Sequence, residues 1–221
     1  MPRTLFVTGT DTGVGKTVAS VALLRALAAS GRRAVGMKPV AAGIDAGDEV
    51  NADVAALFAA GNVDAPLADR NPYSFASPIA PHVAAARTGV TIDLERVAAA
   101  HARLAGRADV VVVEGAGGPL VPIGDRQDML DVARRLAAPV VLVVGVRLGC
   151  LHHALAAELA IRARGLELAG WVANRIDPGM AAAEESIAAL DARLPAPRVA
   201  DLAWGDPVAP GPVDLRSLGF A

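Results

Sequence analysis

The segment Gly9-Thr10-Asp11-Thr12-Gly13-Val14-Gly15-Lys16-Thr17 combines glycines with a lysine and a hydroxyl residue, between an apolar run and a helical pattern. Glycines allow a tight turn whose backbone N–H groups point at phosphate oxygens, at a helix N-terminus that favours negative charge. In such a loop Lys16 can reach the β- and γ-phosphates of a nucleotide, and the Thr17 hydroxyl can ligate Mg²⁺. The segment therefore predicts nucleotide binding.

The spacing of this loop differs from the usual phosphate-binding pattern. It carries five residues between Gly9 and Gly15, one more than the usual pattern has. The alternative interpretation is a glycine-rich turn with an incidental lysine. The position of Gly15-Lys16-Thr17 at the junction of strand and helix favours phosphate binding, although it says nothing about the reaction.

Polar residues follow several apolar runs, at the points where buried strands are expected to end. Lys38 ends the second run, Glu114 ends the third, and Asn174 ends the fifth. Ligands of open parallel sheets bind outside the carboxyl ends of the strands. A lysine, a carboxylate and an amide that converge on this edge predict a binding site there.

Glu114 and Asp53 are the candidate acidic metal ligands. Glu114 follows four apolar residues, where a bound Mg²⁺ would satisfy an otherwise costly buried carboxylate; a helix cap or an arginine partner is the alternative. Asp53 precedes an apolar helical run, so it is either a first-turn residue that complements the helix dipole or a second metal ligand. Lys38 beside Lys16 would supply a second cation for an anionic substrate, and a surface lysine is the alternative.

These residues need a scaffold of short buried strands that alternate with helices. Continuous apolar runs predict strands buried on both faces, namely Leu5 to Thr8, Ala34 to Met37, Val110 to Val113, Val140 to Val144 and Leu168 to Ala173. Two stripes at helical spacing predict intervening helices, namely Val18, Val21, Leu24 and Leu27, and then Leu151, Leu155 and Leu159. The alternation predicts a doubly wound α/β fold of the P-loop NTPase type, with a mostly parallel sheet and helices on both faces.

Composition and charge limit the number of domains and the class of partner. We expect one domain over residues 1–221, and 53% hydrophobic with 20% charged residues argues against disorder. A net charge of −2 argues against a nucleic-acid partner held by phosphate contacts. The single cysteine, Cys150, fits a reducing compartment, and the apolar runs are far shorter than a membrane span. We therefore expect a cytoplasmic protein without a membrane partner.

Two proline-rich stretches are expected to be irregular. Asn71 to Pro81 contains three prolines and is expected to form a long loop on top of the sheet. The tail after Trp204 carries Pro207, Pro210 and Pro212, and it is expected to wrap the surface.

With these residues in place, the chain resembles the dethiobiotin synthetase family over most of its length. The resemblance lies in segments that follow one another in the family's order: Thr8 to Val18 with the extra loop residue, Lys38-Pro39-Val40, Asn71-Pro72-Tyr73 through Pro81-His82, Val113 to Gly118, Val144 to Cys150 with His153, and Gly170 to Asn174. The phosphate-binding loop alone is widespread among proteins. The segments together, in order, are highly specific.

The resemblance implies an ATP- and Mg²⁺-dependent cyclo-ligase of biotin biosynthesis. An amine of 7,8-diaminopelargonate captures CO₂ as a carbamate, ATP phosphorylates the carbamate, and the second amine closes the cyclic urea of dethiobiotin, with release of ADP and phosphate. Such phosphoryl transfer needs positioning and charge neutralisation more than a covalent nucleophile. The resemblance also implies a homodimer, in which the substrate carboxylate docks at a helix start donated by the other subunit.

The resemblance further assigns roles to individual residues. Lys16 and Lys38 would be catalytic, stabilising the carbamate and the transferring phosphoryl group, and the implied Mg²⁺ ligands are Thr17, Asp53 and Glu114. The implied nucleotide contacts are Gly13, Val14, Gly15, Lys16, Thr17, Val18, Asp53, Glu114, Gly115, Ala116, Gly117, Asn174 and Trp204. The implied substrate contacts are Thr12, Lys38, Gly118, Leu151, His152 and His153. Asn174 would recognise the adenine edge, and the backbone near Trp204 would help to hold the base.

Two positions depart from the family pattern, and two other classes share the broad fold. Ala42 stands where many relatives carry a hydroxyl residue; because one neutral hydrogen bond is worth about 1 kcal/mol, we expect weaker binding rather than lost activity. The segment Leu202 to Gly205 lacks the proline often found beside the adenine.

A DNA-partitioning ATPase would carry a lysine early in the loop, where this chain has Thr10-Asp11-Thr12. A ligase with a glutaminase domain would need a catalytic cysteine and a longer chain.

Overall fold

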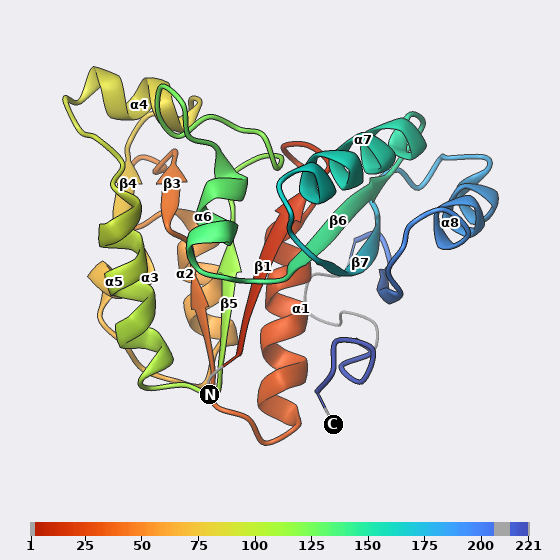
Figure 1. Cartoon of the computed structure of the whole chain (residues 1–221), viewed down its shortest axis with the longest axis horizontal. Coiled ribbons are helices and arrows are strands. Elements are labelled where there is room, and N and C mark those ends of the chain that lie inside the picture. Colours follow the sequence, from red (N-terminus) through yellow and green to blue (C-terminus); the bar gives the residue numbers. More distant parts are fainter. Residues whose placement is uncertain (1–2, 206–212, 221) are drawn as a thin grey trace.

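A parallel sheet forms the centre of the computed structural model, which describes residues 3–205 and 213–220. The order of its six strands is β2-β5-β1-β6-β7-β8, and all neighbours run parallel (Figure 1). The strands are β1 (Arg3–Gly9), β2 (Ala34–Met37), β5 (Val110–Glu114), β6 (Val140–Val146), β7 (Leu168–Arg175) and β8 (Arg198–Leu202). The predicted α/β class with a parallel sheet is confirmed.

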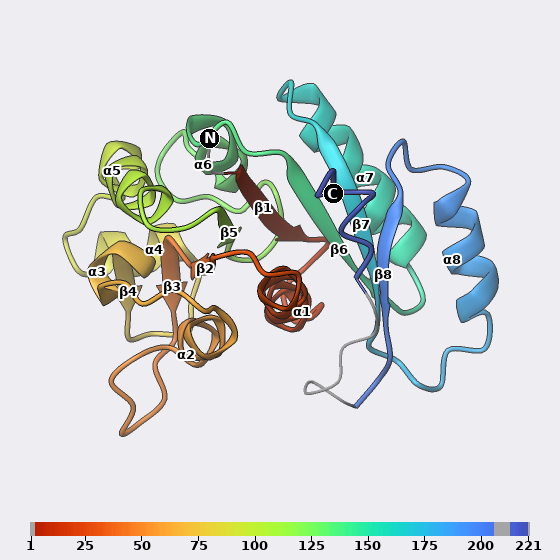
Figure 2. The same ribbon diagram turned by 90° about the horizontal axis from the view of Figure 1, so that it is seen from below.

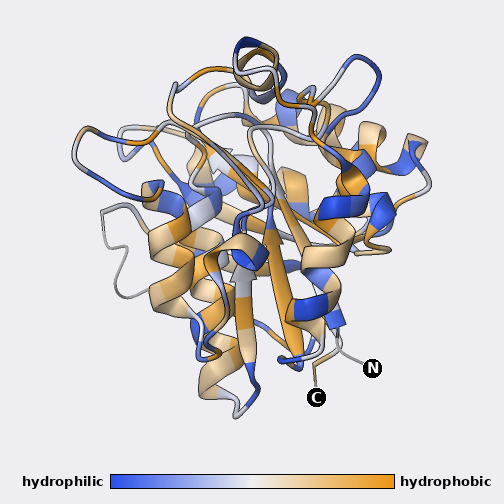
Figure 3. Cartoon of the chain, turned by 90° about the vertical axis from the view of Figure 1, so that its left-hand side faces the viewer, coloured by the Kyte–Doolittle hydropathy of each residue, from blue (hydrophilic) through white to orange (hydrophobic). Residues whose placement is uncertain are grey.

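Helices cover both faces of this sheet, as Figure 2 shows in a view of the chain from below. One face packs against α1 (Lys16–Ala29) and α2 (Ala52–Ala60), and the other packs against α5 (Leu94–Ala105), α6 (Met129–Arg135), α7 (Cys150–Ala163) and α8 (Ala183–Asp191). Successive residues of β1 supply both faces, because Leu5 and Val7 join the core under α1 whereas Phe6 joins the opposite core. The apolar strands therefore lie inside, between two layers of helices, and Figure 3 shows the apolar residues of these strands in orange.

A second, two-stranded sheet lies between β2 and α5 in the sequence. Its strands β3 (Val40–Ala42) and β4 (Tyr73–Phe75) pair in parallel, and the short helices α3 (Leu67–Arg70) and α4 (Pro81–Arg87) flank β4 in the chain. The prediction that Asn71 to Pro81 is entirely loop was wrong at β4. A strand of three residues between prolines is too short to show a periodic pattern.

The last strand, β8, was also missing from the prediction. Arg198 and Asp201 interrupt its apolar pattern, and these two side chains pair with each other at 2.8 Å. The pair satisfies the charges at the edge of the sheet, where one side of a strand is free of neighbours.

The helix predicted from Leu151, Leu155 and Leu159 is confirmed as α7, but this stripe is not the buried face of the helix. Leu151 and Leu159 are 36% and 53% exposed, whereas Cys150, Ala154 and Ile161 are buried. Cys150 and Ala154 bring α7 close to β6; Leu151 and Leu159 face outward, and Leu155 is only partly buried against the core. The stripe predicted for α1 is confirmed by its buried Val21, Leu24 and Leu27 and its partly buried Val18.

Residues 213–220 pack beside the start of β1. The Arg3 guanidinium lies 4.3 Å from the ring centre of Phe220 and donates a 3.0 Å hydrogen bond to the Leu218 carbonyl. Pro207, Pro210 and Pro212, which were expected to wrap the surface, lie outside the described residues. Within residues 3–205 and 213–220, every helix is too short or too polar to cross a membrane.

Candidate active site

The loop between β1 and α1 has the backbone of an anion site. Gly13 and Gly15 have φ angles of 74° and 82°, in the left-handed region that favours glycine. A side chain at Gly15 would also collide with Asn174, because a Cβ there would lie 2.0 Å from the amide Nδ2. The first turn of α1 holds no acidic residue. Its unpaired N–H groups and the positive end of the helix dipole are therefore free to bind phosphate.

Lys16 folds back under this loop. Its Nζ donates a 3.1 Å hydrogen bond to the Asp11 carbonyl, and the residue is buried. Burial lowers the pKa of the Lys16 ammonium group, and the attraction of Glu114 only partly offsets this effect. Phosphate oxygens bound at the loop would compensate the buried positive charge of this ammonium group.

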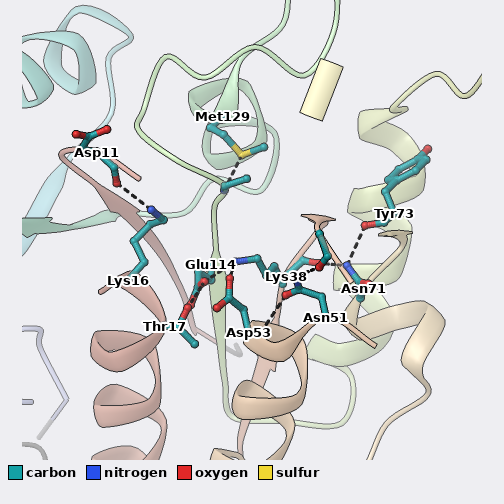
Figure 4. Close-up of polar contacts among 12 residues, drawn as sticks. Asp11, Lys16, Thr17, Lys38, Asn51, Asp53, Asn71, Tyr73, Glu114 and Met129 are labelled. Atoms are coloured by element: carbon teal, nitrogen blue, oxygen red, sulfur yellow. Dashed lines mark hydrogen bonds and ion pairs between the residues drawn. The ribbon is translucent and has the colours of Figure 1, made fainter. Parts of the chain in front are cut away.

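Lys38 lies between two carboxylates, as the close-up in Figure 4 shows. Its Nζ is 2.6 Å from Glu114 Oε1 and 2.5 Å from Asp53 Oδ2. The Thr17 hydroxyl donates a 2.9 Å hydrogen bond to the same Glu114 oxygen. The structure thus brings together four of the predicted residues, one each from α1, α2, β5 and the end of β2.

The charges of this cluster balance one another. Burial alone would lower the pKa of the Lys38 ammonium group, but Glu114 and Asp53 outweigh burial and raise that pKa. Burial alone would raise the pKa of the Asp53 carboxyl, but Lys38 outweighs burial and lowers it. Lys38 and Asp53 are therefore both charged at neutral pH.

Lys16 and Lys38 are the only lysines in the sequence. Every other basic side chain is an arginine or a histidine.

Glu114 and its neighbours also fit a Mg²⁺ site. Glu114 is fully buried, and its Oε2 has no hydrogen-bond partner in the described part of the chain. A buried carboxylate oxygen without a partner is costly, and a hard cation would satisfy it. Among residues 3–205 and 213–220 no three His, Cys, Asp or Glu side chains cluster as metal ligands. Two carboxylates and a hydroxyl suit Mg²⁺, which takes few protein ligands and completes its shell with phosphate oxygens and water.

The cluster opens into a cleft of about 670 Å³. The predicted site residues that line the cleft are Thr12, Gly13, Gly15, Lys16, Thr17, Lys38, Asp53, Ala116 and Gly117. The lining residues that were not assigned from the sequence are Pro78, Ile79, Ala80, Pro81 and Val121. Ala42, where relatives carry a hydroxyl, also lines the cleft. The Asn71 to Pro81 segment therefore forms one wall of the site.

Asn71 is a positioning residue that the sequence reasoning did not single out. Its Nδ2 donates to the backbone carbonyls of Lys38 at 2.7 Å and Tyr73 at 3.0 Å, and all three groups lie in buried surroundings. These bonds tie the end of β2 to the wall of the cleft. The Asn71-Pro72-Tyr73 resemblance was the signal that could have identified this role.

Replacing Asn71 by alanine should therefore loosen the backbone that carries Lys38. Two buried carbonyls would lose their donor, so we expect the free energy of unfolding to fall by about 1–3 kcal/mol and turnover to fall with it. Urea unfolding and steady-state kinetics measure the two effects. The control is Asn62→Ala, because the Asn62 side chain donates to the exposed Arg32 carbonyl and accepts from the Ala34 N–H, at the opposite end of β2 from Lys38. Equal turnover in Asn71→Ala and the unmodified chain would contradict the positioning role.

A second cavity, of about 300 Å³, lies beyond the ends of β6 and β7. Trp204 lines it and is 60% exposed. Asn174 does not line it; its Nδ2 donates a 2.8 Å hydrogen bond to the Val14 carbonyl and so holds the phosphate-binding loop against β7. The two residues predicted to hold the base therefore flank the loop on the side away from Lys38.

The residues predicted to contact the substrate, apart from Lys38, divide between two places; among them, the start of the helix at Leu151 to His153 was expected to hold the substrate carboxylate. Thr12, Gly118 and His153 line a third hollow of about 380 Å³, next to the start of α7. Leu151 and His152 are on the first turn of α7 but line none of these three cavities. Thr12 borders both this hollow and the cleft with the lysines.

Besides Glu114, Asn174 and Trp204, three predicted nucleotide contacts do not line the cleft, and one of them, Val14, is buried in the core. Val18 packs into the core beneath α1. The Gly115 N–H donates to the Val7 carbonyl at 2.9 Å, which leaves Ala116 and Gly117 to face the cleft.

Solved structures with low sequence identity share this fold. The chain matches MinD of Pyrococcus horikoshii, solved with Mg-ADP, with a TM-score of 0.53 and 14% identity over 93% of this chain and 82% of that one. It matches chloroplast FtsY of Physcomitrella patens with a TM-score of 0.58 and 18% identity over 99% of this chain and 64% of that one. These similarities support the P-loop NTPase fold alone.

Sequence comparison identifies closer relatives. An AAA domain family (AAA_26) matches residues 3–210. The chain is 55% identical to the ATP-dependent dethiobiotin synthetase BioD of Aromatoleum aromaticum, over 89% of this chain and 88% of the relative. It is 53% identical to the protein of the same name in Nitrosospira multiformis, over 89% of this chain and 86% of the relative. With its phosphate-binding loop and the lysine–carboxylate cluster beside it, the chain belongs to the ATP-dependent dethiobiotin synthetase family.

Proposed function

We propose that the chain forms dethiobiotin from 7,8-diaminopelargonate, CO₂ and ATP, and releases ADP and phosphate. The observation that carries this proposal is the meeting of Lys16, Lys38 and Asp53 at one cleft beside the phosphate-binding loop, with the buried Glu114 carboxylate paired to Lys38. A triphosphate and an anionic carbamate repel each other. Two ammonium groups at the same cleft lower that repulsion and position both reactants.

Thr17, Asp53 and Glu114 would hold Mg²⁺ on the loop side of the cleft. When bound, Mg²⁺ would neutralise charge on the phosphate oxygens. The buried Glu114 carboxylate offers its free Oε2, and Thr17 keeps its oxygen available as a ligand while it donates its proton to Oε1. A Mg²⁺ ion held by these residues would lie close to the first turn of α1, which carries Thr17.

The reaction proceeds through three steps that these side chains can assist. A substrate amine attacks CO₂ and loses a proton, which gives the carbamate. A carbamate oxygen then attacks the γ-phosphorus, and the bond to the ADP oxygen breaks. The second amine attacks the carbonyl carbon and loses a proton, and phosphate leaves as the urea ring closes. We assign to Lys38 the carbamate and the transferring phosphoryl group, and to Lys16 the β- and γ-phosphates.

We further propose that two copies of the chain form the working enzyme, with the start of α7 reaching the substrate of the partner subunit. The surface around α7 supports this arrangement. Leu120, Leu148 and Leu159 are 55%, 91% and 53% exposed, beside the hollow that Leu120 and His153 line. Apolar side chains gathered in this way mark an interaction surface.

Leu159→Glu should weaken this dimer. A charge placed in an apolar interface loses its water without gaining a partner, so we expect the dissociation constant to rise by at least about tenfold. Sedimentation velocity over a concentration series measures the change. Leu67→Glu is the matched control, since Leu67 is 45% exposed on α3. A monomeric unmodified chain at micromolar concentration would contradict the proposal.

The direct test of function is turnover by the purified chain. The assay follows ADP release with diaminopelargonate, bicarbonate, Mg²⁺ and ATP, and omits one component at a time. We expect ADP release to require both diaminopelargonate and bicarbonate. Release that continues at the same rate without either one would show a different ATPase activity.

A further inference from the structure

Asn51 occupies the N-cap of α2, the helix that carries Asp53. Its Oδ1 accepts a 3.0 Å hydrogen bond from the Asp53 N–H. Asparagine suits this position because its short side chain can satisfy an N–H group that the first helical turn leaves unpaired. The cap therefore fixes the start of α2, and with it the backbone from which the Asp53 carboxylate reaches Lys38 at 2.5 Å.

The other end of the same amide reaches the two-stranded sheet. The Asn51 Nδ2 donates to the carbonyl of Gly43, the residue directly after β3. Gly43 is itself held against β4, since its N–H donates to the Phe75 carbonyl at 2.9 Å. Both Asp53 and Ala42, the residue before Gly43, line the cleft. One side chain, which Figure 4 shows beside Asp53, thus connects a proposed Mg²⁺ ligand with the opposite wall of the cleft.

Burial distinguishes Asn51 from a cap that serves only its own helix. Asn51 is 9% exposed, although residues 45–49 of the loop before it are exposed throughout. Asp93 makes the same kind of cap at the start of α5, through the Glu95 N–H at 2.8 Å, but Asp93 is exposed. A buried amide needs partners for its oxygen and for its nitrogen. Asn51 has one on each of two elements that line the cleft.

We propose that Asn51 is a positioning residue for the reaction, with two separable roles. Its Oδ1 directs Asp53 toward Lys38 and toward the Mg²⁺ that Asp53 would hold, and its Nδ2 keeps the end of β3 in place as a wall for the substrate. Residues that orient a metal ligand typically change metal affinity by about 10- to 100-fold. The inference rests on the proposed function, because it takes Asp53 as a Mg²⁺ ligand and the cleft as the site of diaminopelargonate.

Two substitutions separate these roles. Asn51→Ala removes both hydrogen bonds, whereas Asn51→Ser retains an oxygen that can cap α2 but is too short to reach the Gly43 carbonyl as well. Calorimetry measures the affinity of the full chain for Mg²⁺ in the presence of ADP, and then for diaminopelargonate. We expect Asn51→Ala to weaken Mg²⁺ binding by about 10-fold or more, and diaminopelargonate binding by about 3- to 10-fold. Asn51→Ser should restore Mg²⁺ binding to within about threefold of the unmodified chain, while diaminopelargonate binding stays weak.

Asp93→Ala is the matched control, because it removes an equivalent cap from α5, which contributes no residue to the lining of the cleft. It should leave both affinities unchanged, and urea unfolding shows how much stability each cap contributes. Unchanged affinities in Asn51→Ala, or equal losses in Asp93→Ala, would overturn the positioning role. A loss of Mg²⁺ affinity in Asn51→Ser as large as that in Asn51→Ala would refute the role of Oδ1, and normal diaminopelargonate binding in Asn51→Ser would refute that of Nδ2.

Asp53→Asn separates a failure of this inference from a failure of the proposed function. If Asp53→Asn bound Mg²⁺ as tightly as the unmodified chain, Asp53 would leave the proposed ligand set and the role of the Asn51 Oδ1 would fall with it. If Asp53→Asn bound Mg²⁺ weakly while Asn51→Ala bound it normally, the ligand set would stand and only the positioning role would fail. Diaminopelargonate-dependent ADP release by the unmodified chain shows independently whether the proposed reaction takes place.

Discussion

Lys38→Ala should lower turnover by about 10²–10³-fold while ATP affinity stays close to that of the unmodified chain. Lys38 is the ammonium group on the far side of the cleft from the phosphate-binding loop, held by Asp53 and Glu114. Removing it deletes a charge that meets the carbamate and the transferring phosphoryl group, and leaves the loop backbone intact. Steady-state ADP release and calorimetric ATP titration measure the two quantities.

Arg147→Ala is a suitable comparison for the Lys38 variant. Arg147 is a cationic side chain near the same loop, where it pairs with Asp11 at 2.7 Å, and both partners are half-exposed. Loss of the Arg147 side chain should change turnover much less, because an exposed ion pair contributes little to the stability of the loop. If Lys38→Ala turned over at the rate of the unmodified chain, Lys38 would have no catalytic role.

Glu114→Gln should weaken the apparent Mg²⁺ affinity by at least about 10- to 100-fold. Removing a residue that only hydrogen-bonds to a metal ligand typically costs that much, and Glu114 is itself a proposed ligand. Glutamine keeps the shape of the side chain but removes the negative charge from Glu114, whose Oε2 is buried without a hydrogen-bond partner in the described part of the chain. Turnover as a function of Mg²⁺ concentration gives the shift, and calorimetry of Mg²⁺ with ADP gives an independent value.

The surface variant Glu95→Gln is the control for charge, because Glu95 pairs with Arg135 away from the cleft. It should leave the Mg²⁺ titration in place. A Glu114→Gln titration that overlays that of the unmodified chain would remove Glu114 from the proposed ligand set.

The sheet could be predicted where a strand is buried on both faces, and not elsewhere. Parallel strands that are covered on both faces form unbroken apolar runs, which is why five strands could be found. β2 was predicted with its observed bounds, and the predictions for β1, β5, β6 and β7 were each one to three residues too short in total. β8 carries paired charges, and β3 and β4 have three residues each, so no run marks them. In α7 the leucines gave a clear period, but the period alone does not show that alanines face the strands.

The site could be predicted to the extent that strand ends determine it. Lys38 and Glu114 end neighbouring strands, and parallel register places them together. The role of Asn71 could not be predicted from its position, because it depends on backbone carbonyls that only the folded chain brings to its amide. The division of the binding surface into three hollows likewise depends on how loops from distant parts of the chain meet.

The restriction of lysine to the cleft has a practical consequence. A reagent that acylates primary amines would find only Lys16, Lys38 and the chain's α-amino group, because guanidinium groups do not react under the same mild conditions. Lys16, whose ammonium loses its proton more readily, should be modified before Lys38. Peptide mass spectrometry of the acylated chain, with and without nucleotide, would therefore report occupancy of the cleft from two sites, with no other lysine contributing background.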